Sequence, residues 1–213
     1  YLYSWGIDEI VILNIDRNKE NFKLFPNLIK NCFVPVTVGG GINNLSDVNY
    51  LIENGADKVV LNTFLANKQN LPKTISMKYG RQSLVASIDV KKKNNKYLVY
   101  TNSGNTVSDL NLEDTIKFAN ENGAGEILIN SIDKDGSKLG FDQKLLAFVK
   151  KKTNLPINIC GGAGCEEHFK KIIKQKPSAV CAANFFHFKE QRVRTLKNIL
   201  YKQKEKKNIR LVN

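Results

Sequence analysis

The sequence predicts an α/β protein, a closed (β/α)8 TIM barrel built from two half-barrels, and three observations support this class. The stretch Pro35-Val-Thr-Val-Gly-Gly-Gly-Ile42 recurs 121 residues later as Pro156-Ile-Asn-Ile-Cys-Gly-Gly-Ala163. The apolar run at 59–64 meets the run at 180–185 at the same offset. Apolar strands alternate strictly with helical segments, which indicates a parallel sheet covered by helices. The register of the duplication favours a closed barrel over an open sheet.

Short apolar runs rich in β-branched residues predict strands at 9–15, 34–38, 58–62, 83–90, 126–132, 157–160 and 179–183. Helices are expected between them, at 18–32, 46–54, 68–79, 112–122, up to about 152, at 166–174 and from about 191. Ser46 is expected near the N-cap of its helix, and Gly55, Gly80 and Gly123 are expected to end helices. The polar stretch 91–105 predicts a hairpin that turns at Asn94-Asn95.

Seven strand-helix units do not close a barrel of eight strands. If the 121-residue offset is a half-barrel of four units, the opening strand of the first half has no counterpart in the sequence. We therefore expect one domain over residues 1–213 that lacks its first strand and most of its first helix. A chain in that form is expected to have poor activity.

Composition narrows the classes of function. The 33 Lys and Arg exceed the 20 Asp and Glu by 13, which suits a nucleic acid, a membrane surface or an anionic metabolite. No aromatic run interleaves with basic residues, which disfavours nucleic acid, and no apolar run approaches the roughly 20 residues of a membrane span. Four cysteines without a C-x-x-C pair and two histidines predict neither a metal site nor disulfides. No cofactor is expected, and a reducing cytoplasm fits this composition.

The duplicated glycines are the first candidate site. A strand that ends in glycines before a helix presents backbone N–H groups to a crevice, which suits an anionic ligand. Two copies in register predict two phosphate sites on one face, at Gly41 and Gly162. The alternative interpretation is a pair of tight strand-to-helix turns without a ligand.

Eight motifs in order then carry a resemblance to a known family: Thr37-Val-Gly-Gly-Gly-Ile42, Gly55-Ala-Asp-Lys-Val59, Asn62-Thr63, Ser87-Ile-Asp-Val90, Gly123-Ala-Gly-Glu-Ile-Leu128, Ile132-Asp-Lys-Asp-Gly136, Cys160-Gly-Gly-Ala-Gly164 and Phe186-His187-Phe188. The chain resembles the cyclase subunits of imidazole glycerol phosphate synthase, barrel enzymes of histidine biosynthesis, over essentially all 213 residues. The resemblance implies a lyase reaction of ammonia with a bis-phosphorylated ribulosyl aminoimidazole carboxamide ribonucleotide. The products are imidazole glycerol phosphate and AICAR.

The resemblance also implies residue roles. Asp89 is the expected acid–base catalyst, with a second aspartate on the absent first strand. The expected substrate and phosphate contacts, which are taken from the resemblance, are Gly41, Asn62 and Thr63 for one phosphate, Gly136, Gly162, Ala183 and Asn184 for the other, and Asp135 for the substrate.

Charged residues stand at the opposite ends of three predicted strands. Glu9, Lys58 and Glu126 each precede an apolar run, so they are expected to meet at the bottom of the barrel. Ordinary surface ion pairs are the alternative. The resemblance implies a gate for ammonia from a docked glutaminase subunit, completed by an arginine from the absent strand.

Three positions depart from the family pattern. Asn14 stands where the family has Asp, and Cys160 and Asn184 stand where it has Ser. Related barrels pair with a glutaminase to supply nitrogen for the amidination of bacterial surface sugars, and Cys160-Gly-Gly is similar to theirs. That activity is the alternative function, and a non-catalytic phosphate-binding barrel is a further one. Neither nucleic acid nor membrane is expected as a partner.

Overall fold

The computed structural model describes residues 6–67, 69–187, 192–202 and 209. Phe188 of the last motif and residue 191, where the last helix is expected to begin, lie outside these ranges. Seven strands form one parallel sheet in the spatial order β1 (Ile10–Leu13), β2 (Val36–Gly39), β3 (Lys58–Leu61), β4 (Leu84–Lys93), β7 (Glu126–Ser131), β8 (Ile157–Cys160) and β9 (Ala179–Val180).

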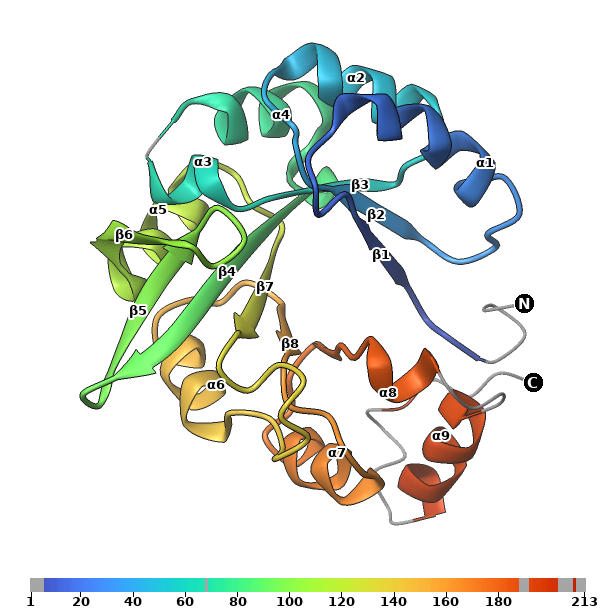
Figure 1. Cartoon of the computed structure of the whole chain (residues 1–213), viewed down its shortest axis with the longest axis vertical. Coiled ribbons are helices and arrows are strands. Elements are labelled where there is room, and N and C mark those ends of the chain that lie inside the picture. Colours follow the sequence, from blue (N-terminus) through green and yellow to red (C-terminus); the bar gives the residue numbers. More distant parts are fainter. Residues whose placement is uncertain (1–5, 68, 188–191, 203–208, 210–213) are drawn as a thin grey trace.

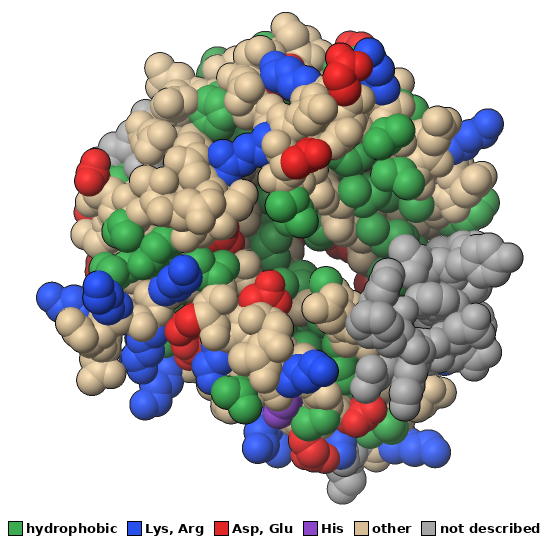
Figure 2. Space-filling model, in the orientation of Figure 1, with side chains coloured by type: hydrophobic (Ala, Val, Ile, Leu, Met, Phe, Trp, Pro, Cys, Tyr) green, Lys and Arg blue, Asp and Glu red, His purple; other side chains and the backbone are tan. Residues whose placement is uncertain are grey.

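Helices surround this sheet on the outside, and the strands curve around a common centre (Figure 1). They are η2 (Lys19–Leu24), α1 (Phe25–Ile29), α2 (Leu45–Glu53), α3 (Thr63–Ala66), α4 (Leu71–Tyr79), η3 (Arg81–Ser83), α5 (Leu112–Glu121), α6 (Gln143–Lys150), α7 (Glu166–Ile173), α8 (Asn184–His187) and α9 (Arg192–Lys202). The face of the molecule in Figure 2 has a hollow at its centre. A curved parallel sheet inside a ring of helices confirms the predicted α/β barrel class.

The ring of strands is open on one side. Within the described residues, β1 pairs only with β2, and β9 pairs only with β8. A partly buried ion pair spans the two sides of this opening, because Lys197 of α9 donates to Asp8, just before β1, over 2.7 Å. Lys197 is only 8% exposed, so the contact holds the last described helix against the first strand.

Two hydrophobic layers fill the space between the sheet and the helices. One belongs to the first half of the chain and includes Val38, Leu51 and Ile75, and the other belongs to the second half and includes Ile129 and Leu146. A third and smaller cluster lines the inside of the barrel with Val60, Val85 and Leu128, against which Cys160 and Cys181 pack. Period-two alternation sends neighbouring residues of each strand to opposite sides of the sheet.

Several element boundaries differ from the sequence predictions. The helix expected at 18–32 is a 3-10 helix followed by a short α-helix that has Pro26 in its first turn. The N-cap expected near Ser46 is Asn44, whose side chain accepts from the backbone N–H of Asp47 over 2.9 Å. The helix expected at 68–79 is α4, which begins at Leu71, and the short helix α3 before it was not predicted.

The predicted hairpin is present and longer than expected. Strand β4 continues to Lys93, turns at Asn94 and Asn95 with φ of 49° and 61°, and returns as β5 (Lys96–Thr101). Two positive φ angles match the left-handed turn that asparagine tolerates. An unpredicted strand, β6 (Thr106–Asn111), pairs with β5.

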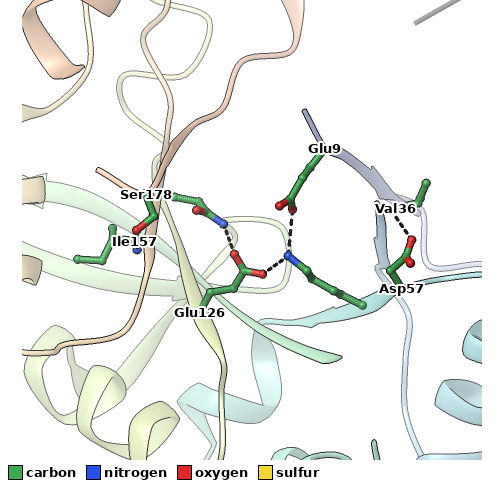
Figure 3. Close-up of polar contacts among 8 residues, drawn as sticks. Glu9, Val36, Asp57, Glu126, Ile157 and Ser178 are labelled. Atoms are coloured by element: carbon green, nitrogen blue, oxygen red, sulfur yellow. Dashed lines mark hydrogen bonds and ion pairs between the residues drawn. The ribbon is translucent and has the colours of Figure 1, made fainter. Parts of the chain in front are cut away.

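The duplication predicted from sequence is reproduced in the backbone. Strands β2 and β8 have bounds that differ by 121 at both ends. In the first half, the backbone N–H of Val36 donates to Asp57 Oδ2 over 2.7 Å. The backbone N–H of Asp57 donates in turn to the carbonyl oxygen of Val36. In the second half, Ile157 and Ser178 make the equivalent pair of bonds, with 3.0 Å from Ile157 N to Ser178 Oγ (Figure 3). A side chain therefore caps the start of the same strand in each half.

None of the helices within the described ranges combines the length and the apolar character needed to cross a membrane.

The two strand caps generate a matched prediction. Asp57→Ala and Ser178→Ala each leave a backbone N–H at a strand start without its side-chain acceptor, so each should lower the free energy of unfolding by about 0.5–1.5 kcal/mol. Urea unfolding measures the change. Asp57→Asn, which keeps a carbonyl oxygen, should retain most of the parent's stability. If both alanine variants unfold like the parent, water replaces the two caps without loss.

Candidate active site

Asp89 lies at the carboxyl end of the parallel part of β4, between asparagines from the two neighbouring strands. Asn62, directly after β3, donates from Nδ2 to Asp89 Oδ2 over 3.2 Å. Asn130, on β7, donates from Nδ2 to Asp89 Oδ1 over 3.1 Å and is the register partner of Asp89. Because barrel active sites lie at the carboxyl ends of the strands, Asp89 stands at the chemically relevant end.

The surroundings of Asp89 oppose its ionisation. Burial raises the pKa of its carboxyl above the ordinary 3.8, the hydrogen bond from Asn130 lowers it, and the charge of Asp135 raises it again, with a net upward shift. The same Asp135 charge contributes to a raised pKa of the Cys160 thiol, so its field acts on both groups. A carboxyl that protonates closer to neutral pH is suited to moving protons in both directions.

The two glycine turns have matching backbone geometry. Gly40 and Gly41 have φ of 87° and 78°, and their counterparts Gly161 and Gly162 have φ of 94° and 103°. These left-handed conformations favour glycine. The predicted turns are thus present in both halves, at the same end of the sheet as Asp89.

Close packing is a second reason for glycine at these turns. A Cβ on Gly162 would lie 2.3 Å from the carbonyl oxygen of Gly140, whose N–H in turn donates to the Gly162 carbonyl over 2.8 Å. A Cβ on Gly41 would lie 3.0 Å from the carbonyl oxygen of Arg17. The glycines therefore serve the fold whether or not an anion binds, and replacing them does not test a phosphate site cleanly.

The remaining predicted phosphate contacts differ in their surroundings. Asn62 precedes α3 and is bound to Asp89 and to the Ser87 carbonyl, so its side chain is already engaged at the centre of the site. Thr63 begins α3. Ala183 and Asn184, which occupy the equivalent positions 121 residues on, are exposed. Gly136 has φ of 72°, and a Cβ there would meet nothing within 4 Å.

Asn14 and Arg17 organise the loop after β1. Asn14 is buried, donates to the Asn18 carbonyl over 2.9 Å and accepts from Asn21 over 3.0 Å. Arg17 donates to Asn102 Oδ1 over 2.9 Å and to Ser103 Oγ over 3.3 Å, at the tip between β5 and β6. Asn14 thus has a structural role in this chain, and Arg17 links its loop to the hairpin.

At the opposite ends of the strands, Lys58 sits between two carboxylates. Its Nζ lies 3.0 Å from Glu9 Oε2 and 2.6 Å from Glu126 Oε1, and Figure 3 shows the two glutamates approaching it from different strands. Burial disfavours the charge of Lys58, but the hydrogen bonds and charges of Glu126 and Glu9 outweigh it and raise the pKa of its ammonium group. The three residues predicted to meet at this end do meet.

An inner wall separates the two ends. Val60, Val85 and Leu128 form it together with the thiols of Cys160 and Cys181. Burial, aided by the charge of Asp135, raises the pKa of Cys160 to about 11, and burial beside Cys160 raises the pKa of Cys181 further. Both thiols stay protonated at neutral pH, so this wall carries no charge.

The sequence analysis missed two asparagines that donate hydrogen bonds to the carboxylates of Glu126 and Asp89. Asn158 on β8 donates from Nδ2 to Glu126 Oε2 over 2.6 Å, and Asn130 donates to Asp89. Counting in steps of two from Glu126 along its strand reaches Leu128 and Asn130 on the same side of the sheet. That count is the signal that would have found Asn130.

Comparisons with known proteins agree over most of the chain. Residues 1–192 match the family described as "Histidine biosynthesis protein". The "Imidazole glycerol phosphate synthase subunit HisF" of Thermotoga sp. (strain RQ2) is 39% identical over 210 residues, which cover 97% of this chain and 82% of that protein. The protein of the same name from Sulfolobus acidocaldarius is 40% identical over 201 residues, which cover 92% of this chain and 80% of that protein.

A third protein of that name, from Flavobacterium johnsoniae, is 39% identical over 202 residues, which cover 92% of this chain and 80% of that protein. Bacterial and archaeal relatives thus resemble the chain to the same degree, and the family match over residues 1–192 spans both glycine turns, Asp89 and the three charged residues at the strand starts. With a family match over 192 residues and relatives at this identity, the chain belongs to the histidine biosynthesis protein family.

Proposed function

We propose that this chain is the cyclase subunit of an imidazole glycerol phosphate synthase, a lyase. It uses ammonia from a glutaminase subunit to convert a bis-phosphorylated ribulosyl aminoimidazole carboxamide ribonucleotide into imidazole glycerol phosphate and AICAR. The observation that carries the proposal is the position of Asp89, held by Asn62 and Asn130 at the end of the strands that bears both glycine turns. The names of the relatives support the same activity.

Asp89 moves the protons in this reaction. Ammonia attack, cleavage of the intermediate and closure of the imidazole ring each require a proton to be taken up or released. A carboxyl with a raised pKa serves as acid and as base in turn, because both of its states are accessible. Asn62 and Asn130 fix the carboxyl plane by holding one oxygen each, so the proton is delivered in a defined direction.

The two turns hold the two phosphates of one substrate across Asp89. Gly41, Asn62 and Thr63 take one phosphate, and Gly136, Gly162, Ala183 and Asn184 take the other, while Asp135 contacts the body of the substrate. Backbone N–H groups make these contacts irrespective of side chain, which is compatible with Ala183 at a position where the other half has Asn62. The twofold backbone repeat supports two sites of one kind.

Ammonia enters at the other end, where Glu9, Lys58 and Glu126 form a gate under the docked glutaminase. The support is the ion-paired lysine at the strand starts, with an uncharged wall between it and Asp89. Neutral ammonia crosses such a wall at lower cost than ammonium, since burying an unpaired charge is expensive. We place the complex in the cytoplasm, which suits the four free cysteines.

Asp89→Asn tests the catalytic role. The change is nearly isosteric, removes the titratable carboxyl and replaces one of its two acceptor oxygens by a donor, so turnover of the bis-phosphate with ammonium as nitrogen source should fall by roughly 10²-fold or more. Binding of the bis-phosphate, followed by isothermal titration calorimetry, should persist. Near-normal turnover would assign Asp89 to a structural role.

Stability against pH provides the control for that variant. Because folding raises the pKa of Asp89, the ionised carboxyl costs stability as the pH rises through its folded pKa, and this cost is absent below the ordinary value of 3.8. The melting temperature of Asp89→Asn relative to that of the parent should therefore rise between pH 3 and pH 7, on top of a pH-independent cost of the altered hydrogen bond. A difference that stays constant over this range would show that folding does not raise the pKa of Asp89.

Lys58→Met tests the gate in the complex with the glutaminase. Without the lysine, Glu9 and Glu126 repel each other, so glutamine-dependent turnover should fall roughly tenfold more than turnover with added ammonium, which reaches Asp89 from the open end. Lys152→Met removes a lysine that pairs with Glu113 at 2.9 Å elsewhere on the surface and should leave the ratio of the two rates unchanged. Equal losses in both assays would exclude a gate.

Gly136→Ala tests the second phosphate site without a steric clash in the free protein. Its Cβ enters open space, so the variant should fold with only the backbone cost of a non-glycine residue at φ of 72°, about 1 kcal/mol. The methyl group should instead obstruct the bis-phosphate, and the affinity for it, measured by calorimetry, should fall roughly tenfold or more. Gly162→Ala, which clashes with Gly140, should lower the melting temperature. Unchanged affinity in Gly136→Ala would remove this loop from the ligand site.

A further inference from the structure

One buried side-chain nitrogen or oxygen atom stands without a partner in the part of the chain that the structure describes, and it belongs to Asn130 beside Asp89. The atom is Oδ1, which is closed to solvent and accepts no hydrogen bond. An unsatisfied buried acceptor is costly, and native structures contain few of them. The position of this one, at the end of β7 next to the proposed catalyst, calls for a functional explanation.

The amide of Asn130 has its orientation fixed by Asp89. A carboxylate only accepts hydrogen bonds, so the nitrogen of the amide must face it, at 3.1 Å. The oxygen is then turned to the opposite side, where a Cβ built on Gly161 would lie 3.1 Å from it. Rotating the amide by half a turn would set its oxygen against the carboxylate, which is electrostatically unfavourable. The free acceptor is therefore directed away from Asp89 and toward the second glycine turn.

The nearest groups on β8 leave this acceptor unsatisfied. Asn130 is the register partner of Cys160, and no hydrogen bond joins its amide oxygen to Cys160 or to Gly161. Glycine at 161 also leaves no side chain over the oxygen. The protein thus supplies an acceptor at this point and no donor.

We infer that Asn130 Oδ1 becomes the acceptor for an N–H group of a reactant beside Asp89 during turnover, when a shift of its side chain or of the second glycine turn opens this oxygen, which is closed to solvent in the free protein. This inference rests on the proposed function, whose reactants carry N–H donors from two sources, ammonia and the nitrogen groups of the bis-phosphate itself. One side of the amide orients the carboxyl that moves protons, and the other side binds a nitrogen. Asn130 thereby sets the direction from Asp89 to the reacting nitrogen and rejects reactants that lack an N–H at that point.

Two leucine variants separate this role from mere support of Asp89. Asn130→Leu removes the donor to Asp89 and the buried acceptor together, in a side chain of similar size. Asn62→Leu removes the other donor to Asp89 and leaves the acceptor in place. The assay is ammonium-dependent turnover, with the KM for ammonium measured at saturating bis-phosphate and the KM for the bis-phosphate at saturating ammonium.

If ammonia is the donor, Asn130→Leu should raise the KM for ammonium by about fivefold to thirtyfold, the value of one buried hydrogen bond, while Asn62→Leu leaves the KM for ammonium unchanged whatever it does to kcat and to binding of the bis-phosphate. If the substrate is the donor, the shift appears in the KM for the bis-phosphate instead, where Asn62→Leu is no control because Asn62 is itself a proposed phosphate contact.

A binding measurement checks the substrate arm independently of turnover. The parent should bind AICAR more tightly than the analogue in which a carboxylate replaces the carboxamide, and Asn130→Leu should lose that preference, because both ligands carry the same phosphate.

The inference is overturned if Asn130→Leu changes neither KM nor the ligand preference and only lowers kcat with a shifted pH profile. Asn130 would then act through Asp89 alone. Melting curves show whether the leucine variant folds, and Asn130→Ser, whose hydroxyl is too short to reach both sides, repeats the test if it does not. Failure of the proposed function is recognised separately, because the parent would then show no ammonium-dependent turnover of the bis-phosphate.

Discussion

The alternation of side chains along hydrogen-bonded parallel strands is the constraint on which the chemistry of this chain depends. Strand β7 shows it most clearly. Glu126, Leu128 and Asn130 point to the inside of the barrel, while Ile127 and Ile129 between them are fully buried under the helices. A shift of one residue in its pairing with β4 would exchange the two sets. The same register therefore places Glu126 beside Lys58 at one end of the barrel, Leu128 in the uncharged wall in the middle and Asn130 beside Asp89 at the other end.

The strands and the large-scale organisation followed from sequence because they depend on patterns that local chemistry fixes. Apolar runs located all seven parallel strands, and the 121-residue repeat located both glycine turns. Helix starts were less predictable. Asn44 and Ser46 are both good N-cap residues, and the choice between them depends on which side chain reaches a backbone N–H. Strand β6 was missed because its alternating pattern is short and lies in a polar stretch.

The candidate site was predicted in part for a related reason. Charged residues at strand starts are unusual enough to notice, and Glu9, Lys58 and Glu126 do lie together. Asn130 and Asn158 carry no such signal, since asparagine is common in this sequence and its role depends on a partner on another strand. The duplication also hides an asymmetry, because Asn62 bonds to Asp89 whereas its counterpart Ala183 has no polar side chain. The half that contains Asn62 thus supplies a hydrogen bond to the carboxylate of Asp89, which an alanine at the equivalent position 183 cannot make.

The ion pair between Asp8 and Lys197 has a consequence for how the chain is made. Its partners are separated by 189 residues, and strand β1 is synthesised long before α9. At roughly 5–20 residues per second, the ribosome needs about 10–40 s to produce the helix that covers this strand. During that interval Asp8 lacks the partner that secures this side of the ring in the complete chain. Closure of the side between β1 and α9 is therefore a late step of folding, which follows the synthesis of most of the chain.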